Sequence, residues 1–128
     1  MGKIYYKELS YKIMGCVFEM YNKVGFGYQE KHYQRILAEL FVINNIKFKK
    51  ELYGKIIFNN KIIAKYYLDF LVENKIIVEL KVANDFYTKH IMQVLTYLKA
   101  HNLKLGLLIL ITKSGIETKR ILNSQIKI

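Results

Sequence analysis

Residues 66–81 read YYLDFLVENKIIVELK, and this segment decides the fold of the chain. It predicts two strands joined by a tight turn at Glu73-Asn74-Lys75, because apolar residues alternate along both flanks of that turn. Successive residues of a strand point to opposite faces of a sheet, so one face of this hairpin is entirely apolar. That face carries Leu68, Phe70, Val72, Ile76, Val78 and Leu80.

The opposite face of the hairpin gathers charged side chains. A turn centred on Asn74 places Asp69 opposite Glu79, and Leu68 opposite Leu80. A register shifted by one residue would move charge onto the apolar face, which a half-buried sheet resists. In the favoured register the Cβ atoms of the two acids lie roughly 4.5–5.5 Å apart, where like charges are destabilising. The hairpin therefore predicts a close pair of carboxylates.

A divalent cation would remove the repulsion between these acids, because hard cations bind carboxylate oxygens. Lys81 lies two residues after Glu79 on the same face, where its ammonium group could bind a phosphate or hold an attacking water. The alternative is a solvent-facing side of a strand on which Lys81 simply offsets the two acids. The hairpin alone leaves both interpretations open.

Length and charge narrow the class of protein. The chain has 128 residues, 52% of them hydrophobic, which predicts one domain spanning residues 1–128 with one core. It carries 21 basic and 10 acidic residues, a formal net charge of +11. This surplus indicates a polyanionic partner, nucleic acid rather than a membrane surface. The alternative is a basic but otherwise ordinary protein from a lysine-rich proteome.

The sequence also bears on location and redox state. Its single cysteine, Cys16, excludes an internal disulfide and fits a reducing compartment. The first residues lack the apolar core of a signal peptide. The longest apolar run, residues 105–111, is far shorter than the roughly 18 residues of a membrane span. We expect a cytoplasmic protein, or a nuclear one if the host has a nucleus.

The remaining segments predict a mixed α/β domain. A helix between two core strands allows a parallel crossover, whereas the central hairpin is antiparallel, so the sheet should be mixed. The expected helices are Lys7 to Lys23, Tyr28 to Asn44 and Lys89 to His101, the last capped by Thr88; the further strands are Ile46 to Phe58, Leu105 to Ile111 and Ile116 to Leu122, with turns at Asn59-Asn60 and Ser114-Gly115.

Lysines gather on the first predicted hairpin. Lysine protects edge strands from pairing with other chains, so a solvated edge is one interpretation. The other is a track for a phosphate backbone. The candidate nucleic-acid-binding residues are Lys47, Lys49, Lys50, Lys55, Lys61 and Lys65, with Lys119 and Arg120 on the last strand.

Several motifs point to a family. Residues 27–33, GYQEKHY, match GxxExxY residue for residue, and Asp69, then Glu79-Leu80-Lys81, then Gln93 with Tyr97 follow in the order typical of the PD-(D/E)XK nuclease superfamily. The chain therefore resembles a GxxExxY protein, a small branch of that superfamily, from about residue 9 to 122. The residue before Asp69 is leucine rather than proline, a letter that the superfamily keeps loosely. The resemblance implies a restriction-endonuclease-like αβββαβ core with an extra N-terminal helix.

The same resemblance implies a metal-dependent nuclease that acts on DNA, with Mg²⁺ or Mn²⁺ as cofactor. Asp69 and Glu79 would be metal ligands, helped by the backbone carbonyl of Leu80. Lys81 would position the attacking water and offset charge that builds up on the phosphoryl oxygens.

Residues on the helices would complete this implied site. Glu30 would reach the metal through water or a second ion, although an acid in a first helical turn is also a plain N-terminal stabiliser. Gln93 would orient the nucleophile or Lys81. We expect Tyr33 and Tyr97 to pack in the core, and His90 to be an ordinary helix-face residue.

Two other functions are consistent with the sequence. One is a non-catalytic nucleic-acid-binding domain on the same fold. The other is a protein-interaction scaffold, for which eleven tyrosines would supply contact surface. A small domain that grips a long polymer is also expected to form a homodimer, by analogy with small nucleases.

Overall fold

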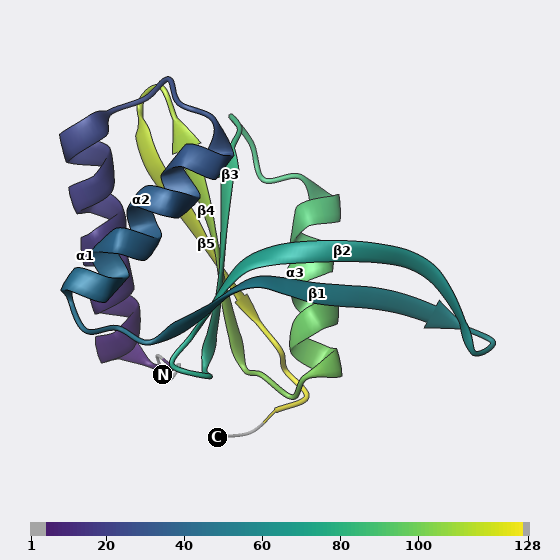
Figure 1. The fold of residues 1–128 in the computed structure, drawn as a ribbon. Helices are drawn as coiled ribbons and strands as arrows, with labels where there is room; N and C mark the ends of the chain where they lie inside the picture. The colour runs from purple at the N-terminus through teal and green to yellow at the C-terminus, as the bar shows by residue number, and fades with distance from the viewer. Residues whose placement is uncertain (1–4, 127–128) are drawn as a thin grey trace.

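The computed structural model describes residues 5–126, which form three helices and a five-stranded sheet (Figure 1). The strand order is β1-β2-β3-β4-β5, with β3 and β4 parallel and the other neighbours antiparallel. The mixed α/β sheet and the parallel crossover through a helix are confirmed. The elements are α1 (Lys7–Val24), α2 (Glu30–Ile43), β1 (Phe48–Phe58), β2 (Lys61–Val72), β3 (Ile76–Val82), α3 (Thr88–Ala100), β4 (Leu105–Thr112) and β5 (Gly115–Leu122).

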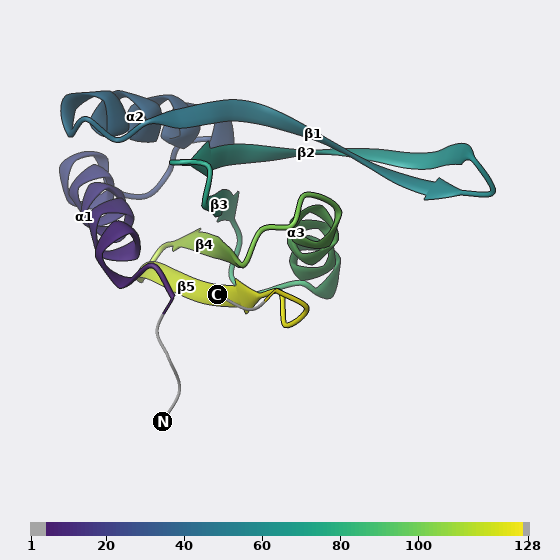
Figure 2. The ribbon, with the colours of Figure 1, turned by 90° about the horizontal axis from the view of Figure 1, so that it is seen from below.

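Helices cover both faces of the sheet. Figure 2 shows α1 and α2 on one side of β3, β4 and β5, and α3 on the other. Phe70 and Val78 are buried in the larger core beneath α1 and α2. Ile77, the neighbour of Val78, is buried in a second core beneath α3, because alternate strand residues face opposite sides. No helix within residues 5–126 is long and apolar enough to cross a bilayer.

The register of the central hairpin is confirmed near its turn. Phe70 pairs with Val78, and Val72 with Ile76, as a turn centred on Asn74 requires. The ladder ends at Phe70, however, so neither Asp69 with Glu79 nor Leu68 with Leu80 forms a ladder pair. Leu68 was expected on the face of Phe70, but it is buried in the core beneath α3. The physical reason is that β2 leaves β3 at this point.

Beyond this point β1 and β2 continue alone as a long two-stranded ribbon. We call residues 53–67 the arm; Figures 1 and 2 show it passing α3 and extending away from the body. Its turn is Asn59-Asn60, with φ of 52° and 60°, which is the left-handed geometry that asparagine favours in tight hairpins. At its root, a Cβ on Gly54 would lie 2.3 Å from the Tyr66 ring, so only glycine lets this ring cross the strand.

The predicted cap at Thr88 and the predicted turn at Ser114-Gly115 are wrong. Thr88 is the first residue of α3 rather than its cap, and the cap position belongs to Tyr87, without a side-chain hydrogen bond. The last strand begins at Gly115, so the preceding turn consists of Lys113 and Ser114. In each case the regular element extends one residue further toward the N-terminus than the side-chain pattern indicated.

Candidate active site

Asp69 and Glu79 face each other where β2 and β3 separate. The Asp69 amide donates a hydrogen bond to Glu79 Oε1 at 2.9 Å, and the Leu80 amide donates to Asp69 Oδ2 at 2.8 Å. Each carboxylate therefore satisfies a backbone amide of the opposite strand, in place of the ladder bonds that end at Phe70. Glu79 is only 2% exposed. The structure thus brings the two acids together at the fork of the strands.

Lys81 and Glu30 join this pair. Lys81 Nζ lies 3.4 Å from Glu79 Oε2 and 3.7 Å from Glu30 Oε1. The Val82 amide donates to Glu30 Oε2 at 3.2 Å, which fixes the first turn of α2 against the end of β3. The chain thus places two acids, one from α2 and one from β3, beside one ammonium group.

Gln34, which was not predicted as a site residue, also contacts the site. Gln34 Nε2 donates to Asp69 Oδ1 at 2.5 Å. Gln34 lies four residues after Glu30 on α2, a spacing that puts both side chains on one stripe of the helix. That spacing is the signal in the sequence that could have identified it.

Three residues of α3 were considered from the sequence, and their surroundings differ. Gln93 is half-buried, and no hydrogen bond or ion pair within residues 5–126 joins it to the acids. Tyr97 is buried and its ring stacks on His101, with centroids 4.0 Å apart. His90 has a buried Nδ1 for which residues 5–126 supply no hydrogen-bond partner, and both burial and the charge of Lys81 lower its pKa. His90 lies half-buried on α3.

Tyr33 has a structural role. Its side chain is fully buried, its hydroxyl donates to the Gly25 carbonyl at 2.7 Å, and the Tyr28 amide donates to that hydroxyl at 3.3 Å. These bonds hold the loop that leads into α2. Because α2 begins at Glu30, the loop sets where Glu30 meets β3.

The electrostatics of the cluster follow from burial. Burial, followed by the charge of Asp69, raises the pKa of Glu79 to about 8. Burial also raises the pKa of Asp69, against the lowering effect of its bond from the Leu80 amide. Burial alone would lower the pKa of Lys81, but the carboxylates of Glu79 and Glu30 more than offset this and raise it. Asp69 and Glu79 therefore bind protons more tightly than ordinary carboxyl groups, while Lys81 stays charged.

A surface cleft of about 420 Å³ opens onto Asp69 between α2 and the β1–β2 hairpin. Three exposed cations line it: Lys31 and Arg35 from α2, and Lys50 from β1. Lys50 was a predicted contact for nucleic acid, whereas Lys31 and Arg35 were not predicted. Three cations beside the half-buried Asp69 make this cleft suited to an anionic ligand. His32, Gln34, Glu51 and Phe70 complete its lining.

The other predicted basic residues are exposed, but they lie on different parts of the molecule. Arg120 on β5 donates to the Ser10 hydroxyl at 3.3 Å and to the Tyr5 carbonyl at 2.9 Å, so it anchors the start of α1. Lys119 Nζ lies 5.9 Å from the centroid of the Phe86 ring. On the β1–β2 hairpin and the approach to it lie the other exposed lysines, Lys47, Lys49, Lys55, Lys61 and Lys65.

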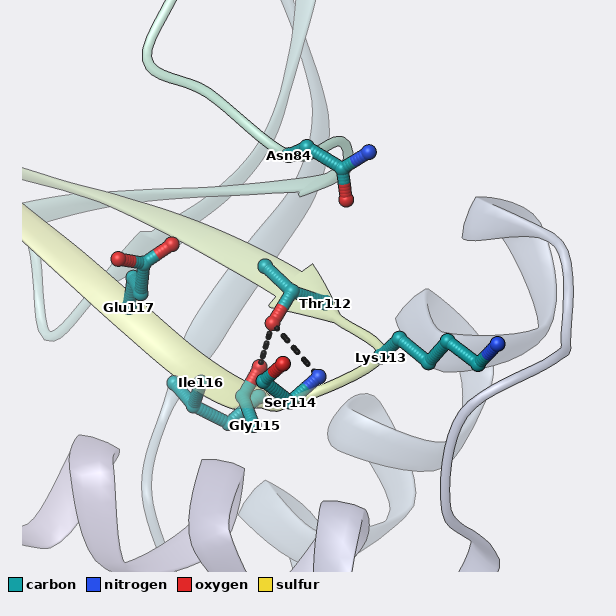
Figure 3. A pocket seen from close by; sticks show the side chains of 7 residues that line it. All are labelled: Asn84, Thr112, Lys113, Ser114, Gly115, Ile116 and Glu117. Carbon is teal, nitrogen blue, oxygen red and sulfur yellow. Dashed lines mark hydrogen bonds between the residues drawn. The ribbon is translucent and has the colours of Figure 1, made fainter.

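A separate cleft of about 320 Å³ lies at the β4–β5 turn (Figure 3). Two hydrogen bonds close the turn itself: Thr112 Oγ1 donates to the Gly115 carbonyl at 2.8 Å, and the Ser114 amide donates to Thr112 Oγ1 at 3.2 Å. In Figure 3 the Lys113 side chain extends away from this turn. None of the residues lining it belongs to the carboxylate cluster, so this cleft is separate from the candidate site at Asp69.

The donor chemistry of the cluster fits a hard divalent cation. Within residues 5–126, no group of three or more His, Cys, Asp and Glu side chains converges closely enough to hold a metal. Mg²⁺, however, is usually bound through one or two carboxylates and keeps several waters, so Asp69 and Glu79 suffice in number. Three acids against one lysine also leave an excess of negative charge when ionised, which a cation would neutralise.

Comparisons with known proteins point the same way as the geometry. A family model described as PD-(D/E)XK nuclease superfamily matches residues 7–121. A solved structure entitled "Crystal structure of SSO0001" is similar in fold, with a TM-score of 0.53 and 21% sequence identity. The match covers 92% of this chain and 59% of that chain, so this chain corresponds to only part of the longer protein. No curated protein matches.

Proposed function

We propose, because the chain belongs to the PD-(D/E)XK nuclease superfamily, that it is a metal-dependent phosphodiesterase that cleaves nucleic acid, with DNA as the expected polymer. One observation supports this most: Asp69 lines a cleft together with three cations, and it faces Glu79, which forms an ion pair with Lys81. The finer assignment to the GxxExxY branch rests on the residues 27–33 motif and stays a prediction.

The proposed ligands of Mg²⁺ or Mn²⁺ are the carboxylates of Asp69 and Glu79 and the backbone carbonyl of Leu80. When bound, the ion would supply Lewis-acid polarisation of the phosphate and would acidify a water molecule. Glu30 is proposed to contribute through water or a second ion. Its contact with Lys81 and its bond from the Val82 amide support a position beside the reacting group.

Lys81 is proposed to act as a fixed cation rather than as a base. Its neighbouring acids raise its pKa, so it stays protonated at neutral pH. An ammonium group in this place orients the attacking water and stabilises negative charge on the phosphoryl oxygens. Gln93 is proposed to orient that water from α3.

The phosphate backbone is proposed to follow the basic surface. Lys31, Arg35 and Lys50 would bind the phosphates nearest to Asp69, since they line the same cleft. The remaining proposed contacts are Lys47, Lys49, Lys55, Lys61, Lys65, Lys119 and Arg120. A homodimer and a cytoplasmic location stay predictions from the sequence, and light scattering of the purified chain tests the first.

The experiment is cleavage of plasmid, single-stranded and branched DNA with Mg²⁺ or Mn²⁺. The parent protein should cut at least one substrate, while Asp69→Ala and Lys81→Ala should not. Lys99→Ala, on the exposed end of α3, is the matched control and should cut normally. If no substrate is cut, or if the two site variants cut as well as the parent, the proposal is wrong.

A non-catalytic nucleic-acid-binding domain is the second candidate. It is favoured by the observation that both acids already bind backbone amides across the strands, which gives them a structural role. Calorimetric titration with Mg²⁺ separates the two functions. Binding that is lost in Glu79→Ala favours the nuclease, whereas DNA binding that needs no metal, in a protein without metal affinity, favours the second candidate.

A further inference from the structure

The arm carries an unusual concentration of exposed apolar side chains. Around its tip, the five large apolar residues are between 44% and 69% exposed. Large exposed apolar groups that lie together commonly mark a binding surface. These residues are Ile56, Ile57, Phe58, Ile62 and Ile63.

The arm is also purely cationic. Lys55, Lys61 and Lys65 lie on it, and residues 52–68 contain no acid. In the strand register Lys55 faces Lys65, so the charge is concentrated on both strands. Pairing this surface with the arm of a second copy would bring like charges together. A polyanion would instead neutralise them, and so the charge favours nucleic acid as the occupant.

The shape of the arm fits a duplex. A two-stranded β-ribbon is one of the two elements that enter a groove of B-DNA, whereas a single strand has no groove to receive it. Apolar side chains at the end of such elements can insert between base pairs and unstack them. Tyr53 and Tyr67 add ring surface on the face of Lys55 and Lys65, with centroids 5.6 Å apart.

The arm is continuous with the candidate active site, because Asp69 and Lys61 lie on the same strand, β2. Eight residues of strand correspond to about 26 Å at 3.3 Å per residue. Along a duplex this is about 8 base pairs at 3.4 Å each. A helix of DNA that touches the tip can therefore also reach Asp69.

We propose that the arm is a duplex-binding ribbon whose lysines bind phosphates and whose apolar tip unstacks a base step about 8 base pairs from the bond that is cut. This inference rests on the proposed nuclease function for its choice of ligand. It makes double-stranded DNA the substrate class, ahead of single strands. It also assigns Ile57, Phe58 and Ile62 a role in binding rather than in stability.

The test uses the full chain in EDTA, so that binding is measured without cleavage. A labelled 30-base-pair duplex is titrated by fluorescence anisotropy, and a series of duplexes with 2-aminopurine at successive positions reports unstacking. The parent should bind and brighten the probe at one step. Phe58→Thr with Ile62→Thr should lose this signal and bind roughly tenfold more weakly. Phe58→Leu, which keeps an apolar tip, should retain both.

Charge is tested separately. Replacing Lys55, Lys61 and Lys65 by glutamine should reduce the slope of log affinity against log salt by about 2.7, or 0.9 per lost phosphate contact. The matched control removes the same charge from the helices, with Lys7→Gln, Lys12→Gln and Lys99→Gln, and should leave the slope unchanged. Circular dichroism should show equal melting temperatures, since all of these side chains are exposed.

The outcomes separate this inference from the proposed function. Unchanged affinity and unchanged probe signal in the tip variant overturn the arm proposal, even if Asp69→Ala still abolishes cleavage. Arm variants that lose binding, in a protein that cuts nothing, support the arm and overturn the nuclease. If sedimentation shows that the tip variant converts a dimer into a monomer with DNA affinity unchanged, the arm is a self-association surface and the proposal is wrong.

Discussion

The side-chain amide of Gln34 donates a hydrogen bond to Oδ1 of Asp69 across 2.5 Å, and so connects α2 with the strand that carries the arm. The other oxygen of Asp69 accepts from the Leu80 amide. Both oxygens are therefore held in place, and the carboxylate has one orientation. A group that orients a metal ligand usually matters almost as much as the ligand itself.

Gln34→Ala should lower the affinity for Mg²⁺ and the rate of cleavage by about 10–100-fold, the range typical of residues that orient metal ligands. Calorimetry and plasmid nicking measure the two quantities. Glu39→Gln, on the exposed side of the same helix, should change neither. Full activity in Gln34→Ala would show that the other bond is enough to hold Asp69.

The stability of the metal-free protein should depend on pH through Glu79. Its pKa is about 8 in the folded chain against an ordinary 4.5, so the folded state binds the proton more tightly. This contribution to stability is full below pH 4.5 and is lost as the pH rises through about 8. In EDTA, the melting temperature should be lower at pH 9 than at pH 6.

Glu79→Gln should flatten that dependence, because an amide does not titrate. Glu39→Gln removes the same charge at an exposed position and should leave the slope as it is in the parent. Thermal unfolding followed by circular dichroism across this pH range provides the comparison. A parent protein whose melting temperature rises from pH 6 to pH 9 would contradict the burial of an acid at this place.

Two glycines should respond in opposite ways to alanine. Gly54→Ala should destabilise the fold by about 1–3 kcal/mol, since its Cβ would overlap the Tyr66 ring. Gly15→Ala, within α1 and with nothing within 4 Å of the added carbon, should stabilise it by roughly 0.5–1 kcal/mol. Denaturant titrations measure the free energy of unfolding of both variants. A Gly54→Ala variant that is as stable as the parent would show that the Tyr66 ring moves aside.

Lys104 should be important for stability, although it lies far from the acids in sequence. It is buried, and its Nζ donates to the Asn123 carbonyl at 3.1 Å and to the Ile126 carbonyl at 2.7 Å. Lys104→Ala leaves both carbonyls without this donor and should cost about 1–3 kcal/mol in chemical unfolding. Lys99→Ala serves as the exposed control, and an equal loss in both variants would contradict this role.

Much of the fold could be predicted because it depends on local patterns. The alternation around Asn74 indicates the register of β2 and β3, and Asn59-Asn60 indicates a second tight turn. The separation of β2 from β3 beyond the Phe70–Val78 pair could not be predicted, because it accompanies the packing of Tyr66 and Leu68 in one core with residues of α3, which are distant in sequence. Thr88 was predicted to cap α3, but it is the first residue of the helix, and Tyr87 takes the cap position.

In the candidate site, too, some residues could be predicted from local patterns and others could not. Asp69, Glu79 and Lys81 lie on neighbouring strands, so their proximity follows from a single hairpin. Gln34 reaches Asp69, and Arg35 lines the same cleft, only because α2 packs against this end of the sheet, and the placement of distant segments leaves no simple trace in one sequence. Glu30 was suspected from the resemblance alone, and the structure places it beside Lys81.

The reciprocal bonds between the two acids and the backbone have an evolutionary consequence. At the fork where β2 departs from β3, Asp69 and Glu79 act as a clasp that holds the diverging strands. Selection for a correctly folded chain would preserve this clasp even in a descendant that had lost cleavage. Retention of both acids in a relative is therefore a poor guide to whether that relative is an active enzyme. Lys81, which binds no backbone group in this fork, would be the more informative residue to inspect.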